Sequence, residues 1–138
     1  MASELLVADL MDKKFNTVKE SDTINKVIRT LMKKGLIGLL VVDDEGNLVG
    51  RLSEKECLDV FVHQTYHALP AGKVKDHMSK IEFTVPSTMT AKEVADVFLE
   101  NNIRRLPVVD SEKLVGQITR RDLVRGLHLH FFPQGVTK

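Results

Sequence analysis

The chain has 138 residues, of which 43% are hydrophobic, and its 20 basic side chains nearly balance its 19 acidic ones. This length and composition fit one compact globular unit, and the balance excludes the basic surface that holds nucleic acid. Its single cysteine, Cys57, excludes an internal disulfide and a cysteine-based zinc site. The longest apolar stretch, 36–42, is far shorter than the roughly 20 residues of a membrane helix, and the N-terminus lacks signal-peptide features. We therefore expect a soluble cytoplasmic protein with no nucleic-acid or membrane partner.

An internal repeat organises the chain. The stretch VADLMDK at 7–13 reappears as VKDHMSK at 74–80, an offset of 67 residues. Further on, LVG at 48–50 reappears at 114–116, after one residue has been dropped from the intervening turn. So many matches at fixed spacing indicate a duplicated unit. We predict a first repeat at 1–66, a linker at 67–73, a second repeat at 74–127 and a C-terminal tail at 128–138.

The first repeat begins with a short amphipathic helical lead at 4–11. A helix then starts at Ser21-Asp22 and ends at Gly35. Strands are predicted at 39–42 and 48–52, and Ser53 caps a last helix that reaches about Val62. The apolar face predicted for the first long helix consists of Ile24, Val27, Ile28, Leu31 and Met32.

The second repeat follows the same plan. Thr90 caps its first helix, with Glu93 in the capping-box position. Strands are predicted at 106–109 and 114–119, with a polar turn between them, and Thr119 caps a helix that begins at Arg120. Pro70 and Gly72 break the stretch between the repeats, and the tail from 128 shows no clear periodicity.

These elements predict an α/β (α+β) fold. A helix, two strands and a helix form a small sheet that leaves one apolar surface bare, and two copies can cover each other. Packing two similar units together also leaves clefts between them, where small ligands are usually held.

One stretch, 103–122, has the residues of a nucleotide-sized anion site. Four arginines flank its two strands, and a guanidinium can grip a phosphate with two parallel hydrogen bonds. Gly116 permits close approach to the backbone, and Asp122 lies in the first turn of the following helix. The alternative is that Thr119 and Asp122 only cap that helix and that Gly116 only marks a bulge. The four arginines are Arg104, Arg105, Arg120 and Arg121.

From about Val7 to Gly126 the chain resembles a tandem pair of cystathionine β-synthase (CBS) domains. The most specific marks are the matching endings GRLSEKE at 50–56 and GQITRRD at 116–122, each preceded by a strand pair of the VVD type. The resemblance implies two tandem β-α-β-β-α repeats packed about a pseudo-twofold axis. It also implies that adenosine-type ligands bind in clefts between the repeats, and that pairs join as homodimers through their helices.

The resemblance also implies roles for individual residues. In the second repeat, Asp122 would bind the ribose hydroxyls, Thr119 the phosphate, and Thr84, Val85 and Ile103 the adenine. The arginines would contact phosphate. This agrees with the chemistry of the side chains, since apolar walls suit a base and arginines suit phosphate. The full predicted set for this better site is Thr84, Val85, Ile103, Arg104, Arg105, Pro107, Thr119, Arg120, Arg121 and Asp122.

The first repeat departs from this pattern. Glu56 stands where the family usually has Asp, and Ile37 and Gly38 replace the paired arginines. We therefore expect unequal sites, with the first one weak, empty or specific for a less charged ligand. Its predicted residues are Thr17, Val18, Leu36, Ile37, Gly38, Ser53 and Glu56.

Other candidates are weaker. His63 and His67 have helical spacing and His128 and His130 alternate, but solvent-facing histidines and a docked or disordered tail explain them better than metal ligands do. Cys57 is expected in the core. No nucleophile with a base, paired catalytic carboxylates or phosphate-binding glycine loop is present, so catalysis is not expected.

Two functions remain open. The first is a stand-alone regulatory module that binds AMP, ADP, ATP or S-adenosylmethionine as an effector, with no obligatory cofactor, and acts on an unknown protein partner. The second is a structural or dimerisation scaffold with vestigial clefts. The sequence leaves the particular adenosyl ligand, the regulated partner and the dimer orientation undecided.

Overall fold

The structure, a computed structural model, describes residues 4–63 and 72–134. The chain forms two compact units, and the residues that make up each unit differ from those of the predicted repeats. One unit is the continuous segment Asn16–Glu82, and the other combines Met1–Phe15 with Phe83–Lys138. We call them the continuous unit and the discontinuous unit.

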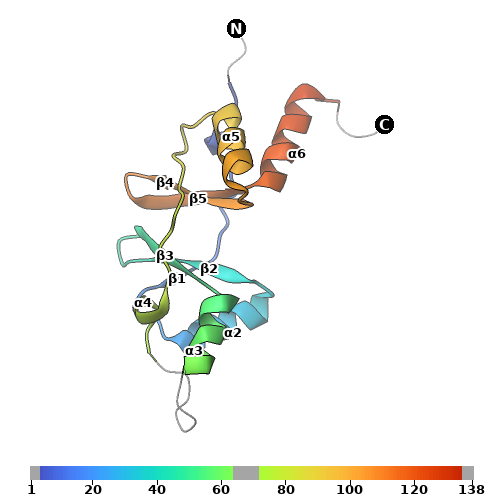
Figure 1. Ribbon diagram of the computed structural model, residues 1–138. Coiled ribbons are helices and arrows are strands. Elements are labelled where there is room, and N and C mark those ends of the chain that lie inside the picture. The colour runs from blue at the N-terminus through green and yellow to red at the C-terminus, as the bar shows by residue number, and fades with distance from the viewer. Residues whose placement is uncertain (1–3, 64–71, 135–138) are drawn as a thin grey trace. The chain divides into compact units, whose positions relative to one another are not determined.

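The continuous unit contains a three-stranded sheet of order β1-β2-β3 (Figure 1). β1 (Thr17–Lys19) runs parallel to β2 (Gly38–Val42), which pairs antiparallel with β3 (Leu48–Ser53). Helices α2 (Ile24–Lys34) and α3 (Glu54–His63) pack together, and the short α4 (Val74–His77) contacts α3. This is the predicted β-α-β-β-α order, so the mixed α and β fold class is confirmed.

Helix α2 ends where predicted and begins two residues later. Gly35 adopts the left-handed conformation, φ 63° and ψ 38°, which a glycine reaches without steric cost. The N-cap is Thr23, whose hydroxyl accepts from Lys26 N–H, so the predicted start at Ser21-Asp22 is wrong. Met32 was also wrongly assigned to the apolar face, because it is 66% exposed.

The discontinuous unit has a two-stranded antiparallel sheet, β4 (Arg105–Asp110) with β5 (Lys113–Thr119) (Figure 1). Helices α5 (Ala91–Asn101) and α6 (Arg120–Phe131) pack together. A single parallel bridge between Val85 and Val108 stands in the place that β1 has in the other unit. Thr90 and Glu93 form the predicted capping box at the start of α5.

The turn between β4 and β5 has an unusual conformation. Asp110 pairs with Lys113, so the turn contains two residues, Ser111 and Glu112. Both have positive φ, 49° and 70°. Two-residue hairpin turns with this geometry normally use asparagine and glycine, so the turn holds local strain.

Helix α6 continues past the predicted boundary. We expected an aperiodic tail from residue 128, but α6 extends to Phe131, and Phe132 N–H donates to the carbonyl of His128 at 2.8 Å. The His128 and Phe132 rings lie 5.2 Å apart, which is the one-turn contact of a helix end. Residues 135–138 of the predicted tail and most of the predicted linker lie outside the described residues.

Each unit takes its lead segment from the opposite repeat. Helix α1 (Val7–Leu10) belongs to the discontinuous unit, where Val7 N–H donates to the carbonyl of Met89 at 2.8 Å. Helix α4 belongs to the continuous unit, where Val74 N–H donates to the carbonyl of Asp22 at 2.8 Å. Val7 and Val74 are both fully buried, so each lead is part of a core.

Each unit has its own apolar core, and the predicted burial of Cys57 is confirmed. The largest fully buried side chains include Ile24 and Leu52 in the continuous unit and Phe98 and Ile118 in the discontinuous unit. Burial of each such side chain contributes about 1.5–3 kcal/mol to stability. Within residues 4–63 and 72–134, no helix has the length and apolar character needed to cross a membrane.

Candidate functional site

The predicted residues of the better site gather where β4 begins and β5 ends. Arg105 pairs with Thr119 across the two strands, and Arg120 N–H donates to the carbonyl of Arg104 at 3.0 Å. Val85 N–H donates to the carbonyl of Pro107 at 3.1 Å, which places the 84–85 segment beside the same strand. Segments from three parts of the sequence therefore meet at one end of this small sheet.

The wall of this site is apolar and its rim is basic. Val85 and Pro107 are buried and Ile103 is partly buried against the core, whereas Thr84 is exposed. Arg104, Arg105 and Arg121 are exposed, and Arg120 is half-buried. A flat apolar group and an anion could therefore be held side by side.

The turn from β5 into α6 forms a capping box. The Thr119 hydroxyl accepts from Asp122 N–H at 3.0 Å, and Asp122 Oδ2 accepts from Thr119 N–H at 2.9 Å. The capping alternative is thus confirmed as a structural role for both residues. The second oxygen, Asp122 Oδ1, lies 2.6 Å from Arg125 Nη2. The Asp122 side chain is 14% exposed, so this oxygen is the part of the carboxylate that a ligand would share with Arg125.

Other atoms of the protein pack closely against the backbone of Gly116. A Cβ there would lie 2.8 Å from Met11 Sδ and 3.0 Å from the carbonyl oxygen of Asp12. Its counterpart Gly50 has the same relation to Met78 and Ser79. Asp12 pairs with Gln117, which fastens the α1 lead to β5. The predicted close approach is therefore made by the lead segment.

The first-repeat residues occupy equivalent places in the continuous unit. Thr17 and Val18 pair with β2, and Gly38 pairs with Ser53. Glu54 N–H donates to the carbonyl of Ile37 at 2.9 Å, just as Arg120 N–H does to that of Arg104. Ile37 is 65% exposed, and Leu36 is partly buried against the core.

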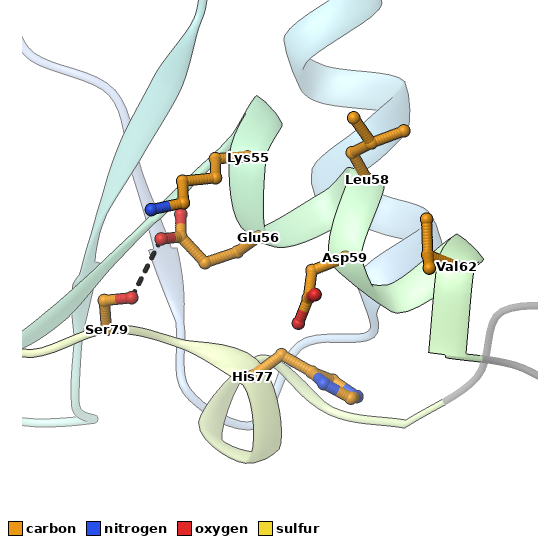
Figure 2. A pocket seen from close by; sticks show the side chains of 7 residues that line it. All are labelled: Lys55, Glu56, Leu58, Asp59, Val62, His77 and Ser79. Carbon is orange, nitrogen blue, oxygen red and sulfur yellow. Dashed lines mark hydrogen bonds between the residues drawn. The ribbon is translucent and has the colours of Figure 1, made fainter.

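The carboxylate of Glu56 is already bound by the protein. Its Oε1 accepts from the Ser53 N–H at 2.6 Å and from the Ser53 hydroxyl at 2.5 Å. Its Oε2 accepts from the Ser79 hydroxyl at 2.8 Å, as Figure 2 shows. Partial burial raises the pKa of the Glu56 carboxyl, but the hydrogen bonds from Ser53 and Ser79 outweigh burial and hold that pKa below its usual value.

Two residues around these carboxylates were missed at the level of sequence. Ser79, which contacts Glu56, is the counterpart of Asp12, and Arg125, which contacts Asp122, is the counterpart of Asp59. Aligning the repeats would have shown both differences. Ser79 also lines a pocket of about 460 Å³ together with Lys55, Glu56, Leu58, Asp59, Val62 and His77.

The described histidines are not gathered into a metal site. His63 Nδ1 lies 3.1 Å from Asp59 Oδ1, which is a surface pair one helical turn apart. His67 lies outside the described residues, and His128 and His130 are on α6. In the part of the chain that the structure describes, no three His, Cys, Asp or Glu side chains are placed to bind one metal ion.

Comparison with known proteins agrees with the duplicated fold. The family model described as "CBS domain" matches residues 7–63 and 74–129. The chain therefore belongs to the CBS-domain family, as a tandem pair.

Among curated relatives, MJ1426 of Methanocaldococcus jannaschii is 29% identical, over 89% of this chain and 91% of that protein. The inosine-5'-monophosphate dehydrogenase of the same organism is 31% identical over 90% of this chain, but this chain spans only 23% of that enzyme. A solved structure of Arabidopsis thaliana CBSX2 in complex with AMP matches with a TM-score of 0.75 and 29% identity, covering 92% of this chain and 98% of that chain. The dehydrogenase match thus concerns a minor part of that enzyme.

Proposed function

We propose that this protein is a regulatory module whose second repeat binds an adenosine nucleotide, with AMP as the preferred effector. The observation that carries the proposal is the meeting of the Thr119–Asp122 turn, the Val85–Pro107 wall and the flanking arginines at one end of β4 and β5. The AMP complex of CBSX2, which has 29% identity to this chain, supports the choice of ligand. No obligatory cofactor and no catalytic step form part of the proposal.

The chemistry of each part matches one part of the nucleotide. Thr84 and Ile103, with the backbone beside the buried Val85 and Pro107, would provide a surface for adenine, and Asp122 Oδ1 can accept from a ribose hydroxyl. Thr119 and the arginines at 104, 105, 120 and 121 serve the phosphate. Two charge-assisted bonds from arginine, at about 1.5–3 kcal/mol each, would favour AMP over adenosine by roughly two to four decades in affinity.

The two repeats are proposed to bind unequally. Glu56 accepts from Ser53 and Ser79, so a ribose there would have to displace internal hydrogen bonds. The counterpart of the arginine pair is Ile37 and Gly38, which offer no charge to a phosphate. We therefore expect the site of Thr17, Val18, Leu36, Ile37, Gly38, Ser53 and Glu56 to be weak or empty.

The regulatory output is proposed to pass to a separate protein partner. A ligand shifts only those equilibria in which it binds the two states differently, so AMP must change the affinity of this chain for that partner or for itself. Exposed apolar side chains on α3 and α6, such as Leu58, Val62 and Val124, support a homodimer. A cytoplasmic location stays a prediction.

The test is calorimetric titration with AMP, adenosine, ATP and S-adenosylmethionine. Asp122→Ala should abolish binding, while the matched first-repeat variant Glu56→Ala should leave the main binding event unchanged. Arg104→Ala should weaken AMP at least tenfold and adenosine little. Circular dichroism establishes that the variants are folded, since Asp122 also caps α6.

The results separate this proposal from a scaffold with vestigial clefts. One strong site per chain, lost in Asp122→Ala, supports the regulatory module. Equal loss of AMP and adenosine in Arg104→Ala would remove that arginine from the phosphate. No heat with any of the four ligands would favour the scaffold.

A further inference from the structure

Helices α3 and α6 present corresponding faces to solvent. The two helices follow the matched strand endings of the two repeats, so residues 66 apart are counterparts. Leu58 and Val124 are counterparts that are 66% and 67% exposed, and Val62, the counterpart of His128, is 69% exposed. Leu58 and Val62 extend from the same part of α3 in Figure 2. Leu58 and Val62 are thus two large apolar side chains, one helical turn apart, that are exposed to solvent, and such a pair indicates a surface that another protein covers.

The two helices carry opposite net charge. Helix α3 has three carboxylates, from Glu54, Glu56 and Asp59, against the single ammonium group of Lys55. Helix α6 reverses this balance, with three guanidinium groups against one carboxylate. Its charged residues are Arg120, Arg121, Asp122 and Arg125.

The sharpest reversal lies next to Leu58 and Val124 in the sequence. Asp59 and Arg125 are counterparts, and their side chains are 70% and 61% exposed. Asp59 contacts His63 and Arg125 contacts Asp122, in each case within the same helix. Both charged ends are therefore accessible for a second ionic contact.

Each face also borders a hollow of similar size. Arg120, Arg121, Val124, Arg125 and His128 line one of about 540 Å³ on α6. The hollow beside α3, about 460 Å³, has Leu58, Asp59 and Val62 in its lining (Figure 2). Each face thus combines an exposed apolar side chain with space beside it.

We propose that α3 of one copy of this chain packs against α6 of a second copy, with Asp59 beside Arg125 of the second copy. If each helix instead packed on its own equivalent about a twofold axis, Asp59 would approach Asp59 of the other copy, and Arg125 would approach Arg125. Like charges at an interface oppose association, whereas opposite charges favour it and fix its register. The proposal rests on the homodimer proposed above and determines its orientation as head to tail.

Charge reversal tests the orientation. Self-association of the full chain is measured by sedimentation equilibrium for the wild type, Asp59→Arg, Arg125→Asp and the double variant. Each single reversal places like charges together at the α3–α6 contact and should weaken the dimer by about tenfold or more. The double variant, with both charges exchanged, should recover most of the wild-type affinity.

Controls come from a surface ion pair between the end of β1 and the turn after β2. Lys19 Nζ and Asp44 Oδ1 lie 3.2 Å apart, and their side chains are 52% and 85% exposed. Lys19→Asp and Asp44→Arg change the charge by the same amounts as the test variants and should leave self-association unchanged. Circular dichroism confirms that every variant is folded.

A cross-linking experiment provides independent evidence. Chains with Leu58→Cys and chains with Val124→Cys are treated with a short bis-maleimide, each alone and then mixed. Cys57 is 6% exposed, so the introduced thiols should react first. The mixture should give a cross-linked dimer, and each variant alone should give little.

The outcomes separate the two proposals. A wild-type chain that stays monomeric up to high micromolar concentration would overturn the dimer itself. If both single reversals leave the dimer affinity unchanged, or if the double variant does not recover the wild-type affinity, the orientation alone would be overturned. Cross-linking of Leu58→Cys to itself would show that like helices meet.

Discussion

Arg125 Nη2 lies 2.6 Å from Asp122 Oδ1, and the counterpart of this cation in the first repeat is Asp59, an acid one turn from Glu56. The two repeats therefore stabilise their equivalent carboxylates in different ways. Asp122 has an exposed guanidinium as partner, whereas Glu56 has the hydroxyls of Ser53 and Ser79. The guanidinium end of this pair is 61% exposed, which limits the worth of the pair to about 1 kcal/mol, so a ribose could displace the guanidinium at little cost.

Replacing Arg125 by methionine should therefore make binding of adenosine tighter, by up to about fivefold, because the ribose no longer competes with an ion pair. The free energy of unfolding should fall by less than about 1 kcal/mol, since the Arg125 side chain is 61% exposed. Titration calorimetry with adenosine at low protein concentration measures the effect. A weaker affinity would mean that Arg125 contacts the nucleoside directly.

The exchanged lead segments predict which unit each core mutation disturbs. Val7 and Val74 are both fully buried, but Val7 packs in the discontinuous unit and Val74 in the continuous unit. Val7→Ala should therefore increase hydrogen exchange at 83–131, and Val74→Ala at 17–63. Each change should cost about 1–3 kcal/mol of local stability. Faster hydrogen exchange at 17–63 in Val7→Ala, or at 83–131 in Val74→Ala, would contradict the exchange of lead segments.

Glu56 should make stability depend on pH in the acid range. Hydrogen bonds hold the pKa of the folded carboxyl below its usual value of 4.5, despite burial that raises it. The unfolded chain then binds more protons, so this stabilisation is present above pH 4.5 and is lost as the pH falls through the folded pKa. In Glu56→Gln the free energy of unfolding, measured with urea from pH 7 to pH 3, should decline less steeply. Parallel curves would exclude the contribution.

Asp110 provides the background for that comparison. The hydroxyl and N–H of Ser87 lower the pKa of the Asp110 carboxyl in the discontinuous unit. Glu56→Gln leaves this group unchanged, so some acid sensitivity should persist. A variant with no remaining pH dependence would indicate that Glu56 acts on more than its own hydrogen bonds.

Glycine should be the better residue at the strained turn of the second hairpin. Glu112 has φ 70°, a conformation that costs an L-residue about 1–2 kcal/mol. Glu112→Gly should raise the free energy of unfolding by about 0.5–1 kcal/mol, after the greater entropy of glycine in the unfolded chain is subtracted. Glu45, in the first hairpin turn, does not have a positive φ, so Glu45→Gly should lower the free energy of unfolding. Chemical denaturation of both variants decides the matter.

Local signals in the sequence predicted local structure well. The Thr119 and Thr90 caps, the Gly35 helix end and the strand pairs depend on neighbouring residues, and each lies where expected or within a residue or two. Clustering of the second-repeat site followed from the same pattern, since the arginines flank paired strands. The ligand roles of these residues stay predictions.

Long-range contacts were harder to predict. Repeat symmetry matches a methionine in each lead with a glycine in each hairpin, but it leaves open whether Met11 meets Gly50 or Gly116. The structure pairs Met11 with Gly116, across more than half the chain. The hydrogen bond from Ser79 to Glu56 depends on the same exchange, so it too lay beyond local pattern.

Because the leads are exchanged, the two units can complete their cores at different times during synthesis on the ribosome. The continuous unit is complete once residue 82 has emerged, and every contact in its core is available from then on. The segment around Val7 emerges before the continuous unit, yet the strands and helix α6 that bury it emerge after that unit. At roughly 5–20 residues per second this segment waits for several seconds without its core. The segment around Val7 is therefore made before the continuous unit but completes its folding after it.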